Sequence, residues 1–206
     1  TQECNEALKM LKGNREERIQ GLRIFCEYRD TRSFPLLLPL LDQPCPVERM
    51  SVVYALGRNP CPSAVEKLVS LLETDDNAYV RRATAWSLAN YDNQIVLEPL
   101  INALKNDVAA VRLWSSSSLA EIGNVSLKNA QLAAEQLLIS LKIDNEPGVR
   151  SNCIWSLCRL YEKLDNTFQE SFVDECTKIA LFDKEPSVME EAKTALDSMG
   201  MQGFYN

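Results

Sequence analysis

The sequence predicts an all-α protein, a right-handed α-solenoid in which about six helix pairs stack in order. Two observations predict this class. A short phrase returns along the chain: turn residues, an apolar residue, an arginine, and a helix that reaches a leucine eight positions after the apolar residue. In addition, no segment alternates polar and apolar residues with the period of a strand. We therefore expect one domain over residues 1–206 built from repeated helix pairs.

The repeated phrase sets the length of each unit. Its arginines are separated by 31, 32, 31 and 38 residues, which is room for two short helices and two turns. In the last copy Met189 takes the position of the arginine. The arginines are Arg18, Arg49, Arg81, Arg112 and Arg150, and the predicted repeats cover roughly 1–30, 31–59, 60–91, 92–124, 125–164 and 165–200, with a tail at 201–206.

An apolar segment precedes each of these arginine-containing helices, as in 35–41, 64–72 and 96–104. Leucines recur in them at i, i+3 and i+4, which indicates one buried helical face. Small residues in the second helices let neighbouring backbones approach, and Trp114 is expected to fill core space beside the serines of 115–118.

The arginines themselves have two interpretations. A guanidinium at the start of each second helix can bond the aspartate or carbonyl groups of the adjoining turn, which would form a structural ladder along the stack. Ligand binding by the same arginines is the alternative. Their fixed spacing favours the structural ladder.

Composition narrows the function classes. Net charge is −7, and a nucleic-acid-binding face would have to be basic, so we expect no nucleic-acid partner. No apolar run approaches the roughly 20 residues of a membrane-spanning helix. The absence of a signal region and the seven unpatterned cysteines favour a soluble protein of a reducing, intracellular compartment. The cysteines are expected to pack in the core, with metal or redox use as the alternative.

The chain contains no histidine, which excludes Ser-His-Asp and Cys-His nucleophile systems and histidine metal sites. We expect no catalytic residue and no metal.

Residues 80–90 (VRRATAWSLAN) and 97–104 (LEPLINAL) resemble the phycobilisome-lyase type of HEAT-like repeat, and the resemblance covers roughly 16–199. That family includes subunits of cyanobacterial bilin lyases and proteins similar to chaperones of phycobiliproteins. The resemblance implies a cytoplasmic or chloroplast-stromal protein that binds a client, with a bilin as a transient ligand at most.

In such repeats the second helices line the concave face. Positions one and five after each arginine should point outward there, and position nine adds further groups. Two tryptophans and a tyrosine in register, flanked by arginines, indicate a surface that a partner covers. The alternative is that Trp86 and Trp155 are hidden between repeats. The candidate binding residues are Met50, Tyr54, Arg58, Arg82, Trp86, Leu113, Trp155 and Arg159.

The sequence is compatible with three functions. The first is a scaffold or chaperone that engages a phycobiliprotein or another photosynthetic assembly client through its concave face. The second is a true bilin lyase subunit, in which arginines pair with the propionates of a linear tetrapyrrole that stacks on the aromatic rings. Such a subunit would need a second HEAT-repeat subunit as its partner. The third is a general adaptor unrelated to pigments.

Overall fold

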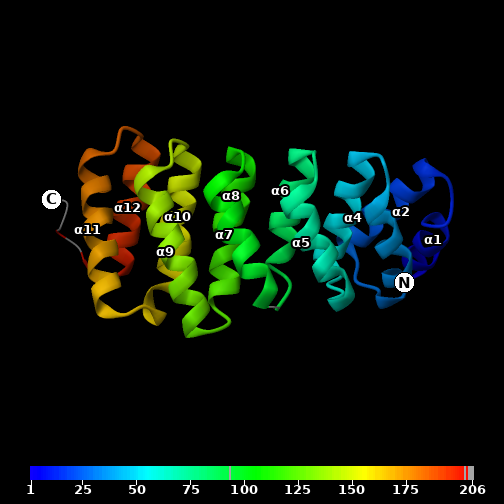
Figure 1. The fold of residues 1–206 in the computed structure, drawn as a ribbon, viewed down its shortest axis with the longest axis horizontal. Helices are drawn as coiled ribbons and strands as arrows, with labels where there is room; N and C mark the ends of the chain where they lie inside the picture. Colours follow the sequence, from blue (N-terminus) through cyan, green and yellow to red (C-terminus); the bar gives the residue numbers. More distant parts are fainter. Residues whose placement is uncertain (93, 202, 204–206) are drawn as a thin grey trace. The chain divides into compact units, whose positions relative to one another are not determined.

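A computed structural model describes residues 1–92, 94–201 and 203. Over these residues it contains twelve α-helices, five short 3-10 helices and no strand, so the all-α prediction is confirmed (Figure 1). The first helices of the six pairs are α1 (Gln2–Met10), α3 (Phe34–Leu37), α5 (Val65–Thr74), α7 (Leu97–Asn106), α9 (Leu127–Ile143) and α11 (Asn166–Phe182). The second helices are α2 (Arg15–Glu27), α4 (Pro46–Arg58), α6 (Ala78–Leu88), α8 (Ala109–Gly123), α10 (Pro147–Leu160) and α12 (Pro186–Ser198). The 3-10 helices are η1 (Thr31–Ser33), η2 (Leu38–Asp42), η3 (Pro62–Ala64), η4 (Gln94–Val96) and η5 (Tyr161–Lys163).

The helix pairs group into two compact units, Thr1–Pro99 (unit 1) and Leu100–Asn206 (unit 2). Helices α1 to α6 belong to unit 1 and α8 to α12 to unit 2, while α7 spans the boundary. Most of the tail predicted at 201–206 lies outside the described residues.

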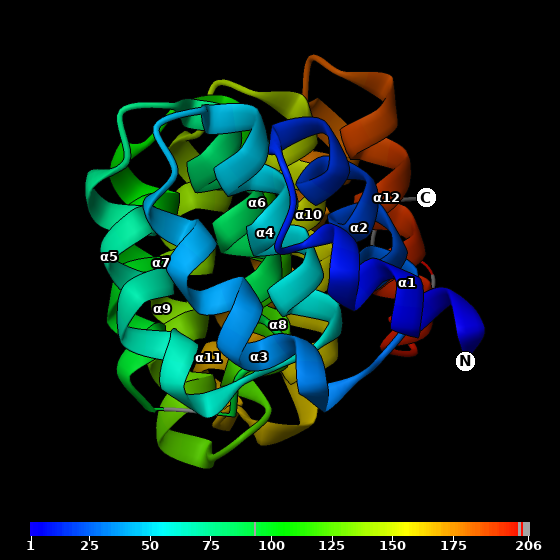
Figure 2. The same ribbon diagram turned by 90° about the vertical axis from the view of Figure 1, so that its right-hand side faces the viewer.

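Unit 1 has two layers of helices. The second helices α2, α4 and α6 contact one another in order, and α5 packs on α6 (Figure 2). Leucine and phenylalanine side chains fill the space between the layers, including the fully buried Leu22, Phe25, Leu56, Leu72 and Leu88. Burying each such side chain stabilises the fold by about 1.5–3 kcal/mol. Because the leucine spacing decides which helix face carries these side chains, it also decides which faces pack together in the stack.

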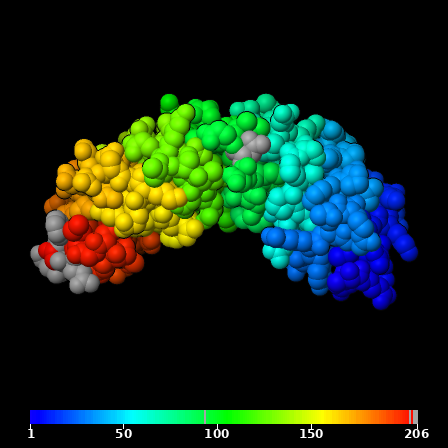
Figure 3. All heavy atoms as spheres, turned by 90° about the horizontal axis from the view of Figure 1, so that it is seen from below, coloured from blue at the N-terminus to red at the C-terminus, as the bar shows by residue number. Residues whose placement is uncertain are grey.

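Unit 2 repeats the arrangement with longer first helices. Helix α10 contacts both α8 and α12, α9 packs on α8 and α10, and α11 packs on α12. In the space-filling view the colours of each unit follow chain order in successive bands (Figure 3). This is the pattern of a repeat protein, in which each pair contacts only its neighbours.

Local sequence signals place the helix ends. Asn14 and Glu17 form a reciprocal capping box at the start of α2, and Ser126 caps α9. Proline occupies the first position of α4, α10 and α12, where its missing N–H costs nothing. The apolar segment 35–41 is not one helix: α3 gives way to η2, which carries Pro39 in its first turn. A proline nitrogen cannot donate the i→i−4 hydrogen bond, so the second pair has a short, broken first helix.

The expectation that Trp114 fills the core is wrong, because the structure leaves 38% of this residue exposed. It lies on the arc of α8 that carries Ala110, Ser117 and Glu121, at i, i+4, i+7 and i+11, and none of these residues is buried. Among the described residues, no helix is both long and apolar enough to cross a membrane.

Candidate functional site

The eight candidate binding residues all lie on second helices, and none of them is buried. Arg58, Trp155 and Arg159 are exposed and the other five are partly exposed. The structure groups them into two patches, one in each unit. The unit-1 patch is Met50, Tyr54 and Arg58 of α4 with Arg82 and Trp86 of α6, and the unit-2 patch is Leu113 of α8 with Trp155 and Arg159 of α10.

In the unit-1 patch the aromatic rings contact each other across two helices. The ring centroids of Tyr54 and Trp86 are 5.4 Å apart and their planes are tilted by 55°. The indole also lies against the backbone of Gly57 on α4, where an added Cβ would come within 2.4 Å of the ring. Trp86 therefore packs into the junction of α4 and α6 and keeps only part of its surface exposed.

The arginines of the unit-1 patch already have neighbours. Arg58 donates from Nε to the carbonyl oxygen of Glu27 at 3.1 Å. The guanidinium of Arg82 lies 5.3 Å from the centroid of the Tyr79 ring, a cation–π arrangement. The patch thus presents two cations beside its aromatic pair.

Trp155 of the unit-2 patch is the more exposed indole, at 40%. Arg159 lies over its ring at 5.0 Å and pairs with Glu121 at 2.8 Å. A surface cavity of about 230 Å³ adjoins the indole. It is lined by Ser117 of α8, by Ser151, Asn152 and Trp155 of α10, and by Glu191 of α12.

Asn152 holds one wall of this cavity in place. Its Nδ2 donates to the carbonyl oxygen of Leu113 at 3.0 Å and to the hydroxyl of Ser117. This arrangement ties α10 to α8 beneath Trp155. The candidate residues predicted from the sequence do not include Asn152, Ser117 and Glu191, because the proximity of these three residues depends on three helices far apart in the sequence.

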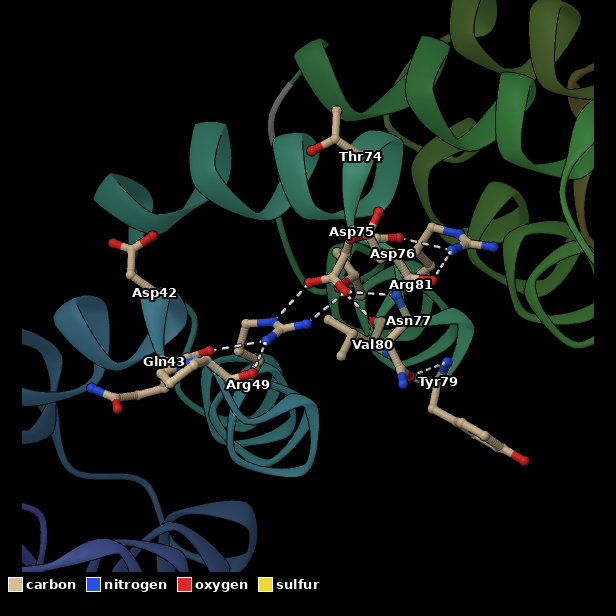
Figure 4. Close-up of polar contacts among 12 residues, drawn as sticks. Asp42, Gln43, Arg49, Thr74, Asp75, Asp76, Asn77, Tyr79, Val80 and Arg81 are labelled. Carbon is tan, nitrogen blue, oxygen red and sulfur yellow. Dashed lines mark hydrogen bonds and ion pairs between the residues drawn. The ribbon is translucent and has the colours of Figure 1, made fainter.

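The repeated arginines occupy the helix turns. Arg49 forms a bidentate pair with Asp75, with Nε–Oδ2 and Nη2–Oδ1 distances of 2.9 Å, and its Nη1 donates to the carbonyls of Gln43 and Pro44 (Figure 4). Asp75 also accepts from the backbone N–H of Asn77 at 2.9 Å. Burial by itself would raise the pKa of Asp75, but the hydrogen bonds from Arg49 and Asn77 outweigh it and hold this pKa below its ordinary value.

The same link recurs in unit 2. Arg112 pairs with Asp144 at 2.8 Å and Arg150 with Asp183 at 2.8 Å, and each aspartate also accepts from a backbone N–H of its own turn. In every case the arginine lies on one second helix and the aspartate in the turn of the following pair.

The first link of unit 1 departs from this pattern. Gln43 stands where later turns carry aspartate, and Arg18 instead pairs with Glu48, which is 1% exposed. Arg81 donates from Nη1 to the carbonyl oxygens of Asp75 and Asp76, at 2.8 and 3.4 Å. These side chains therefore join successive turns and helices.

The described part of the chain contains no group of three or more histidine, cysteine, aspartate or glutamate residues that could hold a metal ion. All seven cysteines are free, and Cys4, Cys61, Cys153 and Cys176 are buried. Cys45 differs from the packing expected of it, since it is only partly buried at the N-terminus of α4, where Arg15 donates to its sulfur at 2.9 Å. The backbone N–H of Glu48 is the main cause of a lowered pKa for this thiol.

Stacked helix pairs joined by turn-to-helix ion pairs define an α-solenoid repeat protein. Comparison with protein families gives the class its name: HEAT repeats match residues 5–89 and 65–158. The chain belongs to the HEAT repeat family. No curated protein matches it.

Several solved structures share the fold. An engineered protein is 19% identical with a TM-score of 0.68, over 94% of this chain and 98% of that one. A designed armadillo repeat protein in complex with the peptide (KR)4 is 17% identical with a TM-score of 0.65, over 100% of both chains. Yeast importin-beta (Kap95p) is 18% identical with a TM-score of 0.60, over 89% of this chain and 28% of its own length. At these identities the likeness establishes the fold.

Proposed function

We propose that this protein is a binding scaffold that engages a segment of a partner protein on the second-helix face of its units. The observation that carries the proposal is the surface position of Trp155. An indole with 40% of its area exposed, beside a cavity and next to an arginine, forgoes burial that a partner would supply. Tryptophan and arginine are the residues that dominate the energetics of protein interfaces.

Two further observations support a scaffold over a self-contained enzyme. The repeated arginines are engaged in turns and ion pairs, which keeps the face in one geometry. A designed repeat protein of the same fold was solved with a peptide, so the architecture is suited to presenting a face to an extended segment.

The test is a capture experiment from the organism that supplies the sequence. The purified chain, with a photo-activatable cross-linker in place of Thr194, an exposed residue of α12 one turn after Glu191 and outside the cavity lining, should trap one protein in preference to others. Trp155→Ala should reduce this trapping about tenfold. The matched control is Leu127→Ala, which removes a side chain of a residue that is 70% exposed on α9, in the other layer of unit 2.

Retention of the trapped protein by Trp155→Ala, together with its loss in Leu127→Ala, would place the binding surface elsewhere and overturn the proposal. Equal retention by both variants and by Trp86→Ala would show that neither patch takes part.

A narrower form of the proposal names the client as a phycobiliprotein subunit or another photosynthetic assembly protein, with this chain as its chaperone. Its support is the sequence resemblance of 80–90 and 97–104 to phycobilisome-lyase-type repeats. Co-elution with purified phycobiliprotein subunits, weakened by Trp86→Ala and Trp155→Ala, is the expected result. Absence of co-elution would leave the general scaffold in place and remove this client.

The alternative of a bilin lyase subunit is less well supported. Bilin propionates would need free guanidinium groups, whereas Arg159 is paired with Glu121 and Arg58 donates to the carbonyl of Glu27. The cavity beside Trp155 is also smaller than the roughly 300–1,000 Å³ of typical small-molecule sites. A titration with free bilin, with and without a second HEAT-repeat subunit, should therefore give no absorbance shift; a saturable shift would favour the lyase function.

A further inference from the structure

The cavity beside Trp155 has a distinct chemical character. Its lining brings together one carboxylate (Glu191), one indole (Trp155), one amide (Asn152) and two hydroxyls (Ser117 and Ser151). No cationic side chain belongs to the described residues that line it. Each of these groups accepts a hydrogen bond or attracts positive charge, so the cavity favours a cation.

Glu191 gives the cavity lining its negative charge. In the described part of the chain, no lysine or arginine forms an ion pair with its carboxylate, and the residue is partly exposed at the cavity. Its neighbour Glu190 instead lies 3.9 Å from Lys193, one turn further along α12. The charge of Glu191 is therefore available to a ligand.

Arg159 does not cancel that charge. Its guanidinium lies over the Trp155 ring and forms a 2.8 Å pair with Glu121, and Arg159 is not one of the cavity-lining residues. The sequence suggested that arginines along the face would attract an anionic ligand. The pairing of Arg159 with Glu121 leaves the carboxylate of Glu191 as the uncompensated charge at the cavity.

The amide of Asn152 provides a further acceptor for a bound cation. Both hydrogen bonds of its Nδ2 are directed at α8, to the Leu113 carbonyl and the Ser117 hydroxyl, so its Oδ1 remains as an acceptor. An ammonium or guanidinium group needs several acceptors around it, and the cavity offers a carboxylate, an amide oxygen and hydroxyls.

We propose that this cavity binds the lysine or arginine side chain of a basic segment of the partner protein. The proposal rests on the scaffold function and gives the chemistry of the partner. The ammonium or guanidinium pairs with the Glu191 carboxylate while the side chain lies along the Trp155 ring. A volume of about 230 Å³ accommodates one long side chain. The acidic surroundings on α12 and the net charge of −7 steer a basic segment toward the site.

The test uses the full chain with Trp86 and Trp114 changed to phenylalanine, so that Trp155 is the one tryptophan left of the three. Circular dichroism is used first to check that this variant is folded. Tryptophan fluorescence then follows titration with a short arginine- and lysine-rich peptide, and with the same peptide carrying glutamate at those positions. The basic peptide should quench or shift the emission with saturation, and the acidic peptide should not.

Glu191→Gln removes the charge while keeping the shape of the side chain, and Glu190→Gln is the matched control one residue away on the same helix. We expect Glu191→Gln to lower the affinity for the basic peptide by about fivefold to tenfold at near-physiological salt. Glu190→Gln should lower this affinity by less than about twofold. Acetylation of the peptide lysines should weaken binding as Glu191→Gln does, because it removes the positive charge.

Three results would overturn the inference. Tighter binding of the acidic peptide would show that the cavity prefers negative charge. Equal losses in Glu190→Gln and Glu191→Gln would reduce it to general attraction between opposite charges. A partner that is trapped through Trp155 but is unaffected by Glu191→Gln would remove the basic-side-chain site while leaving the scaffold function intact. Conversely, peptide binding that depends on Glu191, without any loss of the natural partner in Trp155→Ala, would support the site and contradict the scaffold proposal.

Discussion

Trp86 in unit 1 and Trp155 in unit 2 occupy the same position of the repeat, five residues after the arginine that begins the phrase. Their surroundings differ. Trp86 lies on Gly57 and contacts the ring of Tyr54, whereas Trp155 is 40% exposed beneath the guanidinium of Arg159. The same residue type at the same position therefore serves packing in one unit and forms a surface in the other.

The preceding second helix explains the difference. In α4 the positions five and eight after the arginine are Tyr54 and Gly57; in α8 they are Ser117 and Ala120. A glycine leaves room for an indole to lie on the backbone, and a tyrosine gives it a ring to pack against. Alanine occupies that room with its Cβ and serine offers no ring. The exposure of a residue on a second helix therefore depends on the side chains of the second helix in the preceding pair.

The largest expected effect separates the two tryptophans by stability. Trp86→Ala should lower the free energy of unfolding by about 2–3 kcal/mol, because it empties the junction of α4 and α6, and Trp155→Ala by about 1 kcal/mol or less. Urea denaturation followed by circular dichroism measures both. Equal losses in the two variants would contradict the difference in packing described for the two units.

The ion-pair ladder, in contrast, is common to both units, so its removal should cost about the same in each. Asp75→Asn and Asp183→Asn should each lower the free energy of unfolding by about 1–2 kcal/mol, since each leaves a partly buried arginine without its charge partner. A loss confined to one unit would show that the ladder is not equivalent along the chain.

The pH dependence of stability follows from Asp75. Its pKa is lowered in the folded state, so its contribution is fully present above the unfolded value near 3.9 and is lost as pH falls through the lower folded value. Between about pH 4 and pH 2 the wild-type protein should therefore lose more stability than Asp75→Asn. Parallel curves for the two proteins in acid denaturation would contradict this assignment.

A smaller effect is expected at Gly57, which tests whether this glycine makes room for the Trp86 ring. Gly57→Ala should displace the Trp86 ring, which shows as a red shift of tryptophan emission in a chain that retains only this tryptophan, and should cost about 1 kcal/mol. In a Trp86→Ala background the same change should instead stabilise by up to about 1 kcal/mol, because alanine is the better helix former. A cost that persists without Trp86 would mean that the close approach is to another group.

The smallest effect concerns thiol reactivity and leaves stability unchanged. Cys45 in unit 1 has a lowered pKa, while burial raises the pKa of Cys26 and of Cys158 to about 11 and raises that of Cys153 still further. Alkylation of the folded protein should modify Cys45 first and the fully buried Cys153 and Cys176 last, as peptide mass spectrometry can measure. Faster modification of Cys153 would require an opening of α10 that the packing of unit 2 does not suggest.

The sequence was sufficient to predict the helix pairs, because the arginine period and the leucine spacing arise from the packing that builds the stack. It failed at Trp114, which was expected to fill core space left by the serines of 115–118. Ala110, Ser117 and Glu121 share its arc of α8, and that spacing could have shown the error. It also missed the break in the first helix of the second pair, since a leucine-rich segment was given more weight than Pro39.

The candidate surface could be predicted only in outline. Positions within one helix follow from its period, so the outward direction of Tyr54 or Trp155 was accessible to reasoning. How deeply each lies depends on side chains of the neighbouring helix, as Gly57 shows for Trp86. The cavity beside Trp155 joins Ser117 to Glu191, and nothing in the local sequence of either residue indicates that they meet.

The aspartates of the ladder act twice, since each accepts from a backbone N–H of its own turn and from the guanidinium of the preceding pair. These links have a direction, because in each of them the arginine of one pair bonds the turn of the pair that follows it. Repeats from this protein can therefore be recombined only in phase, with an arginine followed by a matching carboxylate. Helix α12 carries Met189 at the linking position, so an aspartate placed in a turn next to it would gain a guanidinium partner only through Met189→Arg.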